Sequence, residues 1–451
     1  MQIIREPFAQ VNILLGEQSA VTGDTYHGSV YVIREPIDDG VLVYNVLTGE
    51  LILLTKEEAA IFDGDVTFDG AALSETLIHK WYFIANGQSE QTLCDDVRAF
   101  LKSNVKPGSL RGYTIFATMD CNARCFYCFE HGQARTPMSA ETAADVADYI
   151  LRTHVTEPVK LHWFGGEPLV NMQAMDIITT RLKEHGVDYI SDMVSNGYLF
   201  DDDTVKKAVE LWKLYRVQVP IDGTEAVYNK IKAYIYRDGR SAFQIVISNV
   251  ERLIRAGVDV VIRLNMSDTN VDDLYELTRF LIQRFAGMPH WSVYAHLLYD
   301  TPQSPYSPER HLRNAKRLVE FQRFCMANRI AYMPNLPNRL KLNRCGADSP
   351  AAALITPTGA LTLCEHFTET NLAGTIYEGV TDPDIRAAFA KVGNNPELCN
   401  GCPLYPSCVK LVRCPTRPYI CDAADRYMEE AIMHDRMITT YLAYKKANTT
   451  L

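Results

Sequence analysis

Three cysteines stand within eight residues of one short segment, "CNARCFYCFE" at 121–130, with the spacing Cys-x3-Cys-x2-Cys. Thiolates are ligands for zinc and for iron–sulfur clusters. Three of them leave a tetrahedral zinc site one ligand short, whereas in a [4Fe–4S] cluster they leave one iron free to bind another molecule. Cys121, Cys125 and Cys128 therefore predict such a cluster or a zinc knuckle completed by a ligand from elsewhere.

A second group of seven cysteines lies near the C-terminus. Its first part has the pattern Cys-x13-Gly-x4-Cys, and its second part begins with Cys-x2-Cys-x5-Cys. In a reducing compartment so many cysteines indicate metal or redox chemistry rather than structural disulfides. The seven positions are Cys345, Cys364, Cys399, Cys402, Cys408, Cys414 and Cys421.

Strand-end patterns accompany the first cysteine group. "GGEP" at 165–168 and "SNG" at 195–197 each follow a short apolar run. Two glycines allow a backbone to approach a ligand closely, and Glu167 can accept hydrogen bonds from an ammonium group. Taken alone, each pattern is a turn; together with the cysteine segment they predict a ligand site.

The elements that must position these residues form a regular series. From Tyr113 onward, six apolar, β-rich runs alternate with helical stretches, which predicts repeated βα units and a parallel sheet. Six units rather than eight favour an α/β fold with a partial (β/α)6 TIM-like barrel, open on one side. The chemistry of such barrels lies at the C-terminal strand ends, and the cysteine segment directly follows the first strand.

A chain of 451 residues predicts more than one domain. The N-terminal region has two or three short strands followed by helices, a winged-helix-like pattern, with Thr55 as a helix N-cap and "KPGS" at 106–109 as a linker. The predicted units are 1–105 (winged-helix-like), 112–300 (barrel), 301–344 (bridge), 345–425 (cysteine-rich, iron–sulfur) and 426–451 (helix).

Net charge, hydrophobic runs and the first residues indicate which partners and which compartment to expect. The net charge is −10 and no Lys/Arg block stands out, which argues against a nucleic-acid or anionic-lipid partner. No run of about 20 apolar residues is present to cross a bilayer. The first residues, "MQIIREPFAQ", lack the pattern of a secretory signal, so we expect a cytoplasmic protein without a membrane partner.

The cysteine segment and the strand-end motifs resemble those of the radical S-adenosylmethionine (SAM) enzymes. The resemblance implies that SAM chelates the free iron and is cleaved by one electron to a 5′-deoxyadenosyl radical. It also implies that Tyr127 lies beside the adenine. Gly165, Gly166 and Glu167 would hold the methionine amino group, and Ser195 and Asn196 the ribose or carboxylate.

The partner of the SAM carboxylate is left open. Many relatives carry a His-Asp pair and then an arginine after the fourth strand, where this chain reads "VYNKIKAY" at 227–234. Lys232 could serve as a point charge, though not bidentately. Arg263 and Asn265 are further candidates. For each of the three, the alternative is a surface residue that takes no part in SAM binding.

The C-terminal cysteines resemble the SPASM extension of peptide-modifying radical SAM enzymes, which holds two auxiliary [4Fe–4S] clusters. The resemblance assigns Cys399, Cys402, Cys408 and Cys421 to one cluster. It assigns Cys345, Cys364 and Cys414 to the other, although five residues separate Cys408 from Cys414 where relatives have three. With the first group, this implies three [4Fe–4S] clusters; a zinc ribbon is the alternative.

The three-cysteine auxiliary set lacks a fourth ligand. Cys325, water or a backbone atom caps it, or its open iron binds a thiolate of the substrate, because coordination deprotonates a thiol. Glu365 follows Cys364, where sulfatase-maturing relatives carry an acidic general base. Glu365 is therefore the candidate base, and a hydrogen-bonding role near the cluster is its alternative.

These resemblances imply a radical SAM oxidoreductase that matures a ribosomally made peptide (RiPP). The expected product is an intramolecular thioether between a cysteine and a peptide carbon. The 1–105 region loosely resembles domains that add a leader peptide as an edge strand. The partners would be a precursor peptide with a leader and an electron donor of flavodoxin or ferredoxin type. Rival functions are carbon–carbon crosslinking, formylglycine formation in a sulfatase, and a non-catalytic iron–sulfur scaffold.

Overall fold

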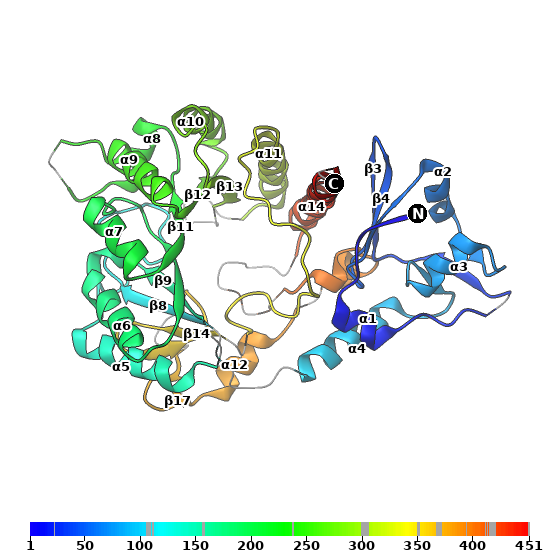
Figure 1. Cartoon of the computed structure of the whole chain (residues 1–451), viewed down its shortest axis with the longest axis horizontal. Coiled ribbons are helices and arrows are strands. Elements are labelled where there is room, and N and C mark those ends of the chain that lie inside the picture. Colours follow the sequence, from blue (N-terminus) through cyan, green and yellow to red (C-terminus); the bar gives the residue numbers. More distant parts are fainter. Residues whose placement is uncertain are drawn as a thin grey trace.

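The structure is a computed structural model of the whole chain (Figure 1). The predicted linker at 106–109 lies outside the residues that it describes. The described residues are 1–21, 23–104, 110, 112–155, 158–236, 239–298, 306–349, 352–366, 372–393, 395–410, 412, 414 and 421–449.

Six parallel strands form the predicted barrel sheet, in the order β13-β12-β11-β10-β9-β8. This confirms an α/β fold built on a parallel sheet. The strands are β8 (Gly112–Thr118), β9 (Val159–Gly165), β10 (Tyr189–Val194), β11 (Leu214–Pro220), β12 (Asp259–Met266) and β13 (Trp291–Leu297). The helices are α5 (Ala140–Thr153), α6 (Met172–Glu184), α7 (Asp202–Glu210), α8 (Glu225–Lys232), α9 (Ala242–Arg255), α10 (Val271–Arg284) and α11 (Pro308–Ala327).

Local sequence explains where these helices begin and which face they bury. The Ser139 hydroxyl accepts the backbone N–H of Thr142 at the start of α5, and Ser241 caps α9 in the same way. In α9 the apolar residues recur three or four positions apart, so that one stripe faces the sheet. That stripe comprises Phe243, Val246, Ile247, Val250, Leu253 and Ile254, all in the barrel core.

The C-terminal region continues the barrel sheet. Strand β14 (Ala352–Ile355) pairs in parallel with β8, and β15 (Ala360–Thr362), β16 (Leu372–Thr375) and β17 (Gly379–Val380) extend the sheet further. The sequence predicted a separate unit from 345, whereas the structure joins its strands to the barrel. Two short helices follow, α12 (Pro383–Ala390) and α13 (Pro396–Cys399).

The N-terminal region holds two antiparallel sheets among its described residues, more strands than the winged-helix-like pattern predicted. The sheets have the orders β1-β5-β4-β3 and β6-β2-β7. Thr55 caps a helix as expected, in a capping box with Glu58. The elements are β1 (Gln2–Arg5), α1 (Ala9–Leu15), β2 (Thr25–Gly28), β3 (Val32–Ile37), β4 (Gly40–Asn45), β5 (Leu51–Leu54), α2 (Lys56–Ala59), β6 (Val66–Thr67), α3 (Ala72–His79), β7 (Phe83–Ala85) and α4 (Glu90–Ser103).

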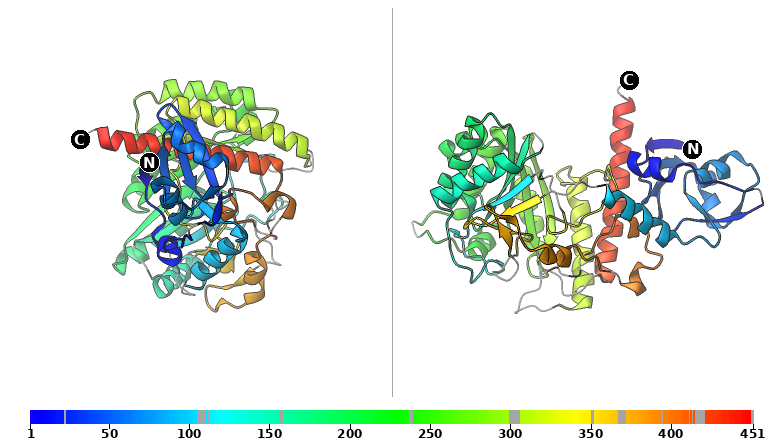
Figure 2. Two further views of the ribbon diagram at one scale, coloured as in Figure 1. Left: turned by 90° about the vertical axis from the view of Figure 1, so that its right-hand side faces the viewer. Right: turned by 90° about the horizontal axis from the view of Figure 1, so that it is seen from below.

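The long helix α14 (Ala423–Thr449) lies between the barrel and the sheet β1-β5-β4-β3, called the N-terminal sheet below (Figures 1 and 2). Asp435 on this helix pairs with Arg323 of α11 at 3.3 Å, and His434 contacts Glu35 of β3 at 2.6 Å. Its apolar face packs on β3, β4 and β5. Within the described residues, no helix is both long and apolar enough to cross a membrane.

Candidate functional site

The loop after β8, which carries Cys121, Cys125 and Cys128, lies directly against the end of β9. The N–H of Gly166 donates to Thr118 O at 3.0 Å, and that of Glu167 donates to Asp120 O at 2.8 Å. A Cβ on Gly165 would overlap the carbonyl oxygen of Thr118, and one on Gly166 would overlap that of Asp120. The two glycines of the motif are thus required by the approach of the two strand ends.

Glu167 joins the second and third strand-end motifs. Its carboxylate accepts the hydroxyl of Ser195 at 2.8 Å and the backbone N–H of Asn196 at 2.7 Å. The side chain is fully buried, which raises its pKa to about 7. Asn196 Nδ2 then donates to Asn122 Oδ1 at 2.6 Å and lies 3.8 Å from Cys121 Sγ. The motifs therefore meet at the first cysteine, and their SAM contacts stay predictions.

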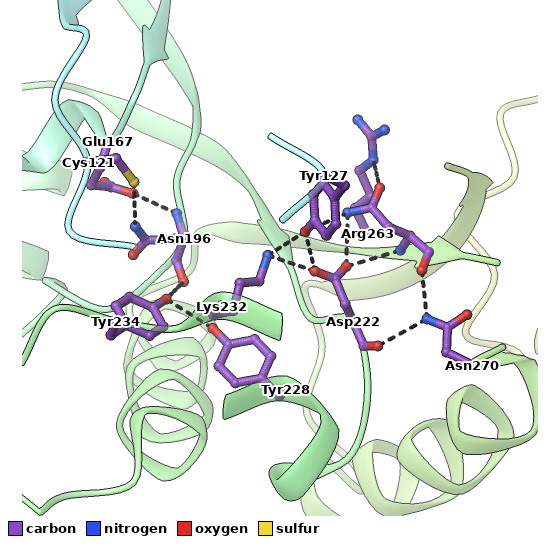
Figure 3. A network of polar contacts seen from close by, with 11 residues as sticks. Cys121, Tyr127, Glu167, Asn196, Asp222, Tyr228, Lys232, Tyr234, Arg263 and Asn270 are labelled. Atoms are coloured by element: carbon purple, nitrogen blue, oxygen red, sulfur yellow. Dashed lines mark hydrogen bonds and ion pairs between the residues drawn. The ribbon is translucent and has the colours of Figure 1, made fainter. Parts of the chain in front are cut away.

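A second buried network centres on Asp222, at the end of β11 (Figure 3). Its carboxylate accepts the hydroxyl of Tyr127 and pairs with Lys232 Nζ at 2.8 Å. Asn265 Nδ2 donates to the same carboxylate at 2.9 Å. Burial lowers the pKa of Lys232, but Asp222 and Tyr127 outweigh it and raise that pKa well above its ordinary value.

This network assembles four sequence-predicted residues, Tyr127, Lys232, Arg263 and Asn265, around one that sequence reasoning did not select. Lys232 Nζ donates to the hydroxyl oxygen of Tyr127 at 2.9 Å, and Arg263 Nε donates to Asn265 Oδ1 at 2.9 Å. Asp222 is the shared acceptor; its position at a strand end in "IDG" was the available signal. The ammonium of Lys232 is ion-paired with the Asp222 carboxylate. A contact from Lys232 to SAM stays a prediction.

The three thiols of the loop lie near one another. Burial raises the pKa of Cys121 to about 12, and the charges of Glu167, Cys125 and Cys128 contribute. Burial likewise raises the pKa of Cys128 to about 11. A metal that binds here must therefore displace protons from these thiols.

Glu365, the candidate base, faces residues of the barrel sheet. Burial among surrounding protein atoms raises its pKa, while the charges of His162 and Arg263 lower it. His162 on β9 is hydrogen-bonded to Asp192 on β10, and the strand register places the two residues side by side. Burial raises the pKa of Glu130 to about 7, and the charge of the nearby Glu365 contributes to this rise. Water still reaches the Glu365 side chain, which is exposed.

The structure brings together the three cysteines of the first auxiliary set. Burial raises the pKa of Cys364 to about 11, and Cys345 and Cys414 contribute through their charges. Cys325 lies elsewhere, on the buried face of α11 with Phe321 in the barrel core, and only burial shifts its pKa. Cys325 is thus placed in the barrel core rather than with this set.

The four cysteines of the second auxiliary set line one cavity of about 630 Å³. The charges of Cys408 and Cys399 act on Cys421, and that of Cys399 acts on Cys402, so the four thiols are neighbours. The cavity lies between α4, the segment 337–344, the Cys399–Cys408 loop and α14. Arg98 of α4 donates to the carbonyl oxygens of Pro406 at 2.8 Å and Cys408 at 2.7 Å.

The donor sets fit iron–sulfur clusters. Each set consists of thiols alone, the donor type that such clusters take. In a cluster each thiolate binds a different iron, so the thiols surround a space. The four cysteines of the second auxiliary set line one cavity in this way.

Comparisons with known proteins agree with this geometry. Residues 115–281 match the radical SAM superfamily, so the chain contains a radical SAM domain. The fold resembles native anSMEcpe with bound AdoMet, with a TM-score of 0.58 at 16% identity, over 74% of this chain and 99% of that chain. It also resembles SuiB of Streptococcus suis bound to the precursor peptide SuiA, with a TM-score of 0.53 at 14% identity, over 89% of this chain and 99% of that chain. No curated protein sequence matches the chain.

Proposed function

We propose that this chain is a radical SAM oxidoreductase that modifies a ribosomally made precursor peptide, forming a thioether from a cysteine of that peptide to one of its carbons. The observation that carries the proposal is the meeting of the cysteine loop with the GGEP and SNG motifs at the C-terminal ends of parallel strands. In a barrel of this kind, that edge is where catalytic groups gather.

Cys121, Cys125 and Cys128 would hold the cluster that binds SAM. The cluster would supply one electron, and SAM cleaved by that electron would supply a carbon-centred 5′-deoxyadenosyl radical that can remove a hydrogen atom from the substrate. Tyr127 and Arg263 would line the SAM site, because the Asp222 network fixes both near the loop. Glu167, Ser195 and Asn196 would support it from the opposite side through their shared hydrogen bonds.

Glu365 would accept a proton from the substrate on its carboxylate. A raised pKa makes a carboxylate a better proton acceptor near neutral pH. Its exposure leaves it reachable for a substrate, and the charge of Arg263, which hydrogen-bonds to Asn265 of the Asp222 network, acts on it. The cysteines of the two auxiliary sets would hold clusters that accept the electron released when the new bond forms.

Solved structures of similar proteins with bound peptides support a peptide substrate. SuiB is solved with a precursor peptide, and anSMEcpe is solved with the Cp18Cys peptide. In this chain the N-terminal sheet would bind the leader by strand addition. Strand β3 is one edge of that sheet, paired with β4 on one side only among the described residues.

The test uses the anaerobically reconstituted full chain with SAM, a flavodoxin or dithionite, and a cysteine-containing precursor peptide encoded beside it. We expect 5′-deoxyadenosine, loss of two hydrogen atoms from the peptide and masking of one thiol. The Glu365→Gln variant should still form 5′-deoxyadenosine but leave the peptide mass unchanged.

Other outcomes identify the rival functions. Loss of two hydrogens with every thiol free would replace the thioether by a carbon–carbon bond. An aldehyde on the peptide, trapped by a hydrazide, would indicate formylglycine formation. No 5′-deoxyadenosine with any peptide would contradict the enzyme assignment altogether.

A further inference from the structure

Lys410 is a buried ammonium without a hydrogen-bond acceptor among the described residues. Its residue exposure is 6%, and its Nζ makes no hydrogen bond. Asp425 Oδ2 lies 3.7 Å away, near enough for an ion pair but without a hydrogen bond. An ammonium carries three donors, and leaving them unmet in a buried site is costly.

Lys410 also lines the cavity that holds Cys399, Cys402, Cys408 and Cys421. Its positive charge acts on the thiols of Cys408 and Cys421, where it is the largest charge effect on each. Lys410 and the four cysteines therefore line the same cavity.

Of the other cations of the cavity wall, Arg98 and Arg436 each also have a buried Nε without a hydrogen-bond partner among the described residues, whereas Arg426 and Arg344 reach water. Arg426 is paired with Glu430 at 2.8 Å, and its side chain is 36% exposed. The Arg344 side chain is 30% exposed, so water can satisfy its donors. The Lys410 side chain, at 7%, has no such outlet.

We propose that the Lys410 ammonium donates hydrogen bonds to the iron–sulfur cluster held by the Cys399, Cys402, Cys408 and Cys421 quartet and offsets its negative charge, which raises the reduction potential of that cluster. A cluster bound by four thiolates is anionic and becomes more so on reduction. A fixed cation with hydrogen bonds to the sulfurs favours the reduced form. This inference rests on the proposed assignment of the quartet to a cluster.

The test measures potentials rather than turnover. The first cluster is removed with the Cys121→Ala, Cys125→Ala and Cys128→Ala substitutions in the full chain, which is then reconstituted with iron and sulfide. Redox titration followed by electron paramagnetic resonance reports the auxiliary clusters. We expect Lys410→Met to shift one midpoint negatively by about tenfold in the redox equilibrium, about 59 mV for one electron.

Two control variants separate charge from structure. Lys102→Met removes an exposed charge from the wall of the same cavity, and Lys410→Arg keeps the buried charge. Both should change the redox equilibrium of the auxiliary clusters by no more than about twofold relative to the parent. Asp425→Asn removes the opposing carboxylate and should shift the midpoint positively.

Unchanged midpoints in Lys410→Met, with full iron content, would overturn the inference. If Lys410→Met fails to bind this cluster while Lys410→Arg binds it, the ammonium is needed for the cluster and the inference stands. Loss of iron in both variants would make Lys410 a structural residue. A parent chain that binds zinc at the quartet would instead overturn the proposed assignment of that site.

Discussion

Gly165 and Gly166 leave no room for a side chain where the cysteine loop meets β9. The carbonyl oxygens of Thr118 and Asp120 occupy the positions that a Cβ would take. Both oxygens also accept backbone N–H groups from this turn. The motif is therefore needed for the backbone contact that holds the loop, whatever ligand the loop binds.

We expect Gly166→Ala to push the cysteine loop away from β9 and to destabilise the fold by about 1–3 kcal/mol, as overpacking does. Iron bound per chain after reconstitution should fall as well. Gly64→Ala is the matched control, because no atom lies within 4 Å of its added Cβ. Equal melting temperatures and iron contents for the two variants would contradict the prediction.

The Asp222–Lys232 pair is buried, with both residues 1% exposed. Lys232→Met leaves the Asp222 carboxylate without its counter-charge, and breaking a buried pair in this way typically costs about 3–5 kcal/mol. We expect a clear fall in melting temperature. The double variant with Asp222→Asn should recover most of that loss, since neither charge remains; a double variant as unstable as the single one would argue against the ion pair.

At the scale of elements, helix α4 of the N-terminal region supports the loop that carries Cys402 and Cys408. Arg98 donates to carbonyl oxygens of that loop and lies over the Tyr405 ring, 5.0 Å from its centroid. Asp95 accepts the Tyr405 hydroxyl at 2.9 Å. A cysteine-bearing loop and a helix about 300 positions earlier thus form one local structure.

We therefore expect Arg98→Ala to loosen this loop. Reconstituted Arg98→Ala should contain less iron than the parent by up to one cluster, and the loop should be cleaved faster in limited proteolysis. Arg34→Ala removes an exposed arginine of the same region, paired with Asp63 at 3.0 Å, and should change neither quantity. Parent-like iron and proteolysis in Arg98→Ala would show that the loop needs no support from α4.

For the whole molecule, α14 connects the barrel to the N-terminal sheet. Met437 is fully buried in the cluster that it forms with Leu42, Tyr44 and Leu51 of that sheet. The opposite side of α14 is held to α11 through Asp435 and Arg323. A C-terminal helix thus sets where the N-terminal sheet lies relative to the barrel (Figure 2).

Met437→Lys should separate the N-terminal sheet from this helix, because it buries a charge in an apolar contact. We expect protease cleavage between the two regions and a lower melting temperature for the N-terminal part. Leu442→Lys on the same helix is the control, since Leu442 is 58% exposed. If both variants resist protease equally, the contact does not hold the regions together.

The sequence by itself determined the barrel elements and the cysteine loop. Helix caps such as Ser139 and Ser241, and apolar periodicity, act over a few residues and are therefore readable from one stretch of chain. The spacing of Cys121, Cys125 and Cys128 is local in the same sense. The match of 115–281 to the radical SAM superfamily agrees with that interpretation.

Only the tertiary structure decided which distant residues share a site. Asp222 as the acceptor for Tyr127 and Lys232, the pairing of β14 with β8, and the place of Cys325 in the barrel core come from packing between segments far apart in the chain. The same holds for Lys410 beside the cysteine quartet. Spacing along the chain carries no information on such pairs, because burial of each apolar face selects them collectively.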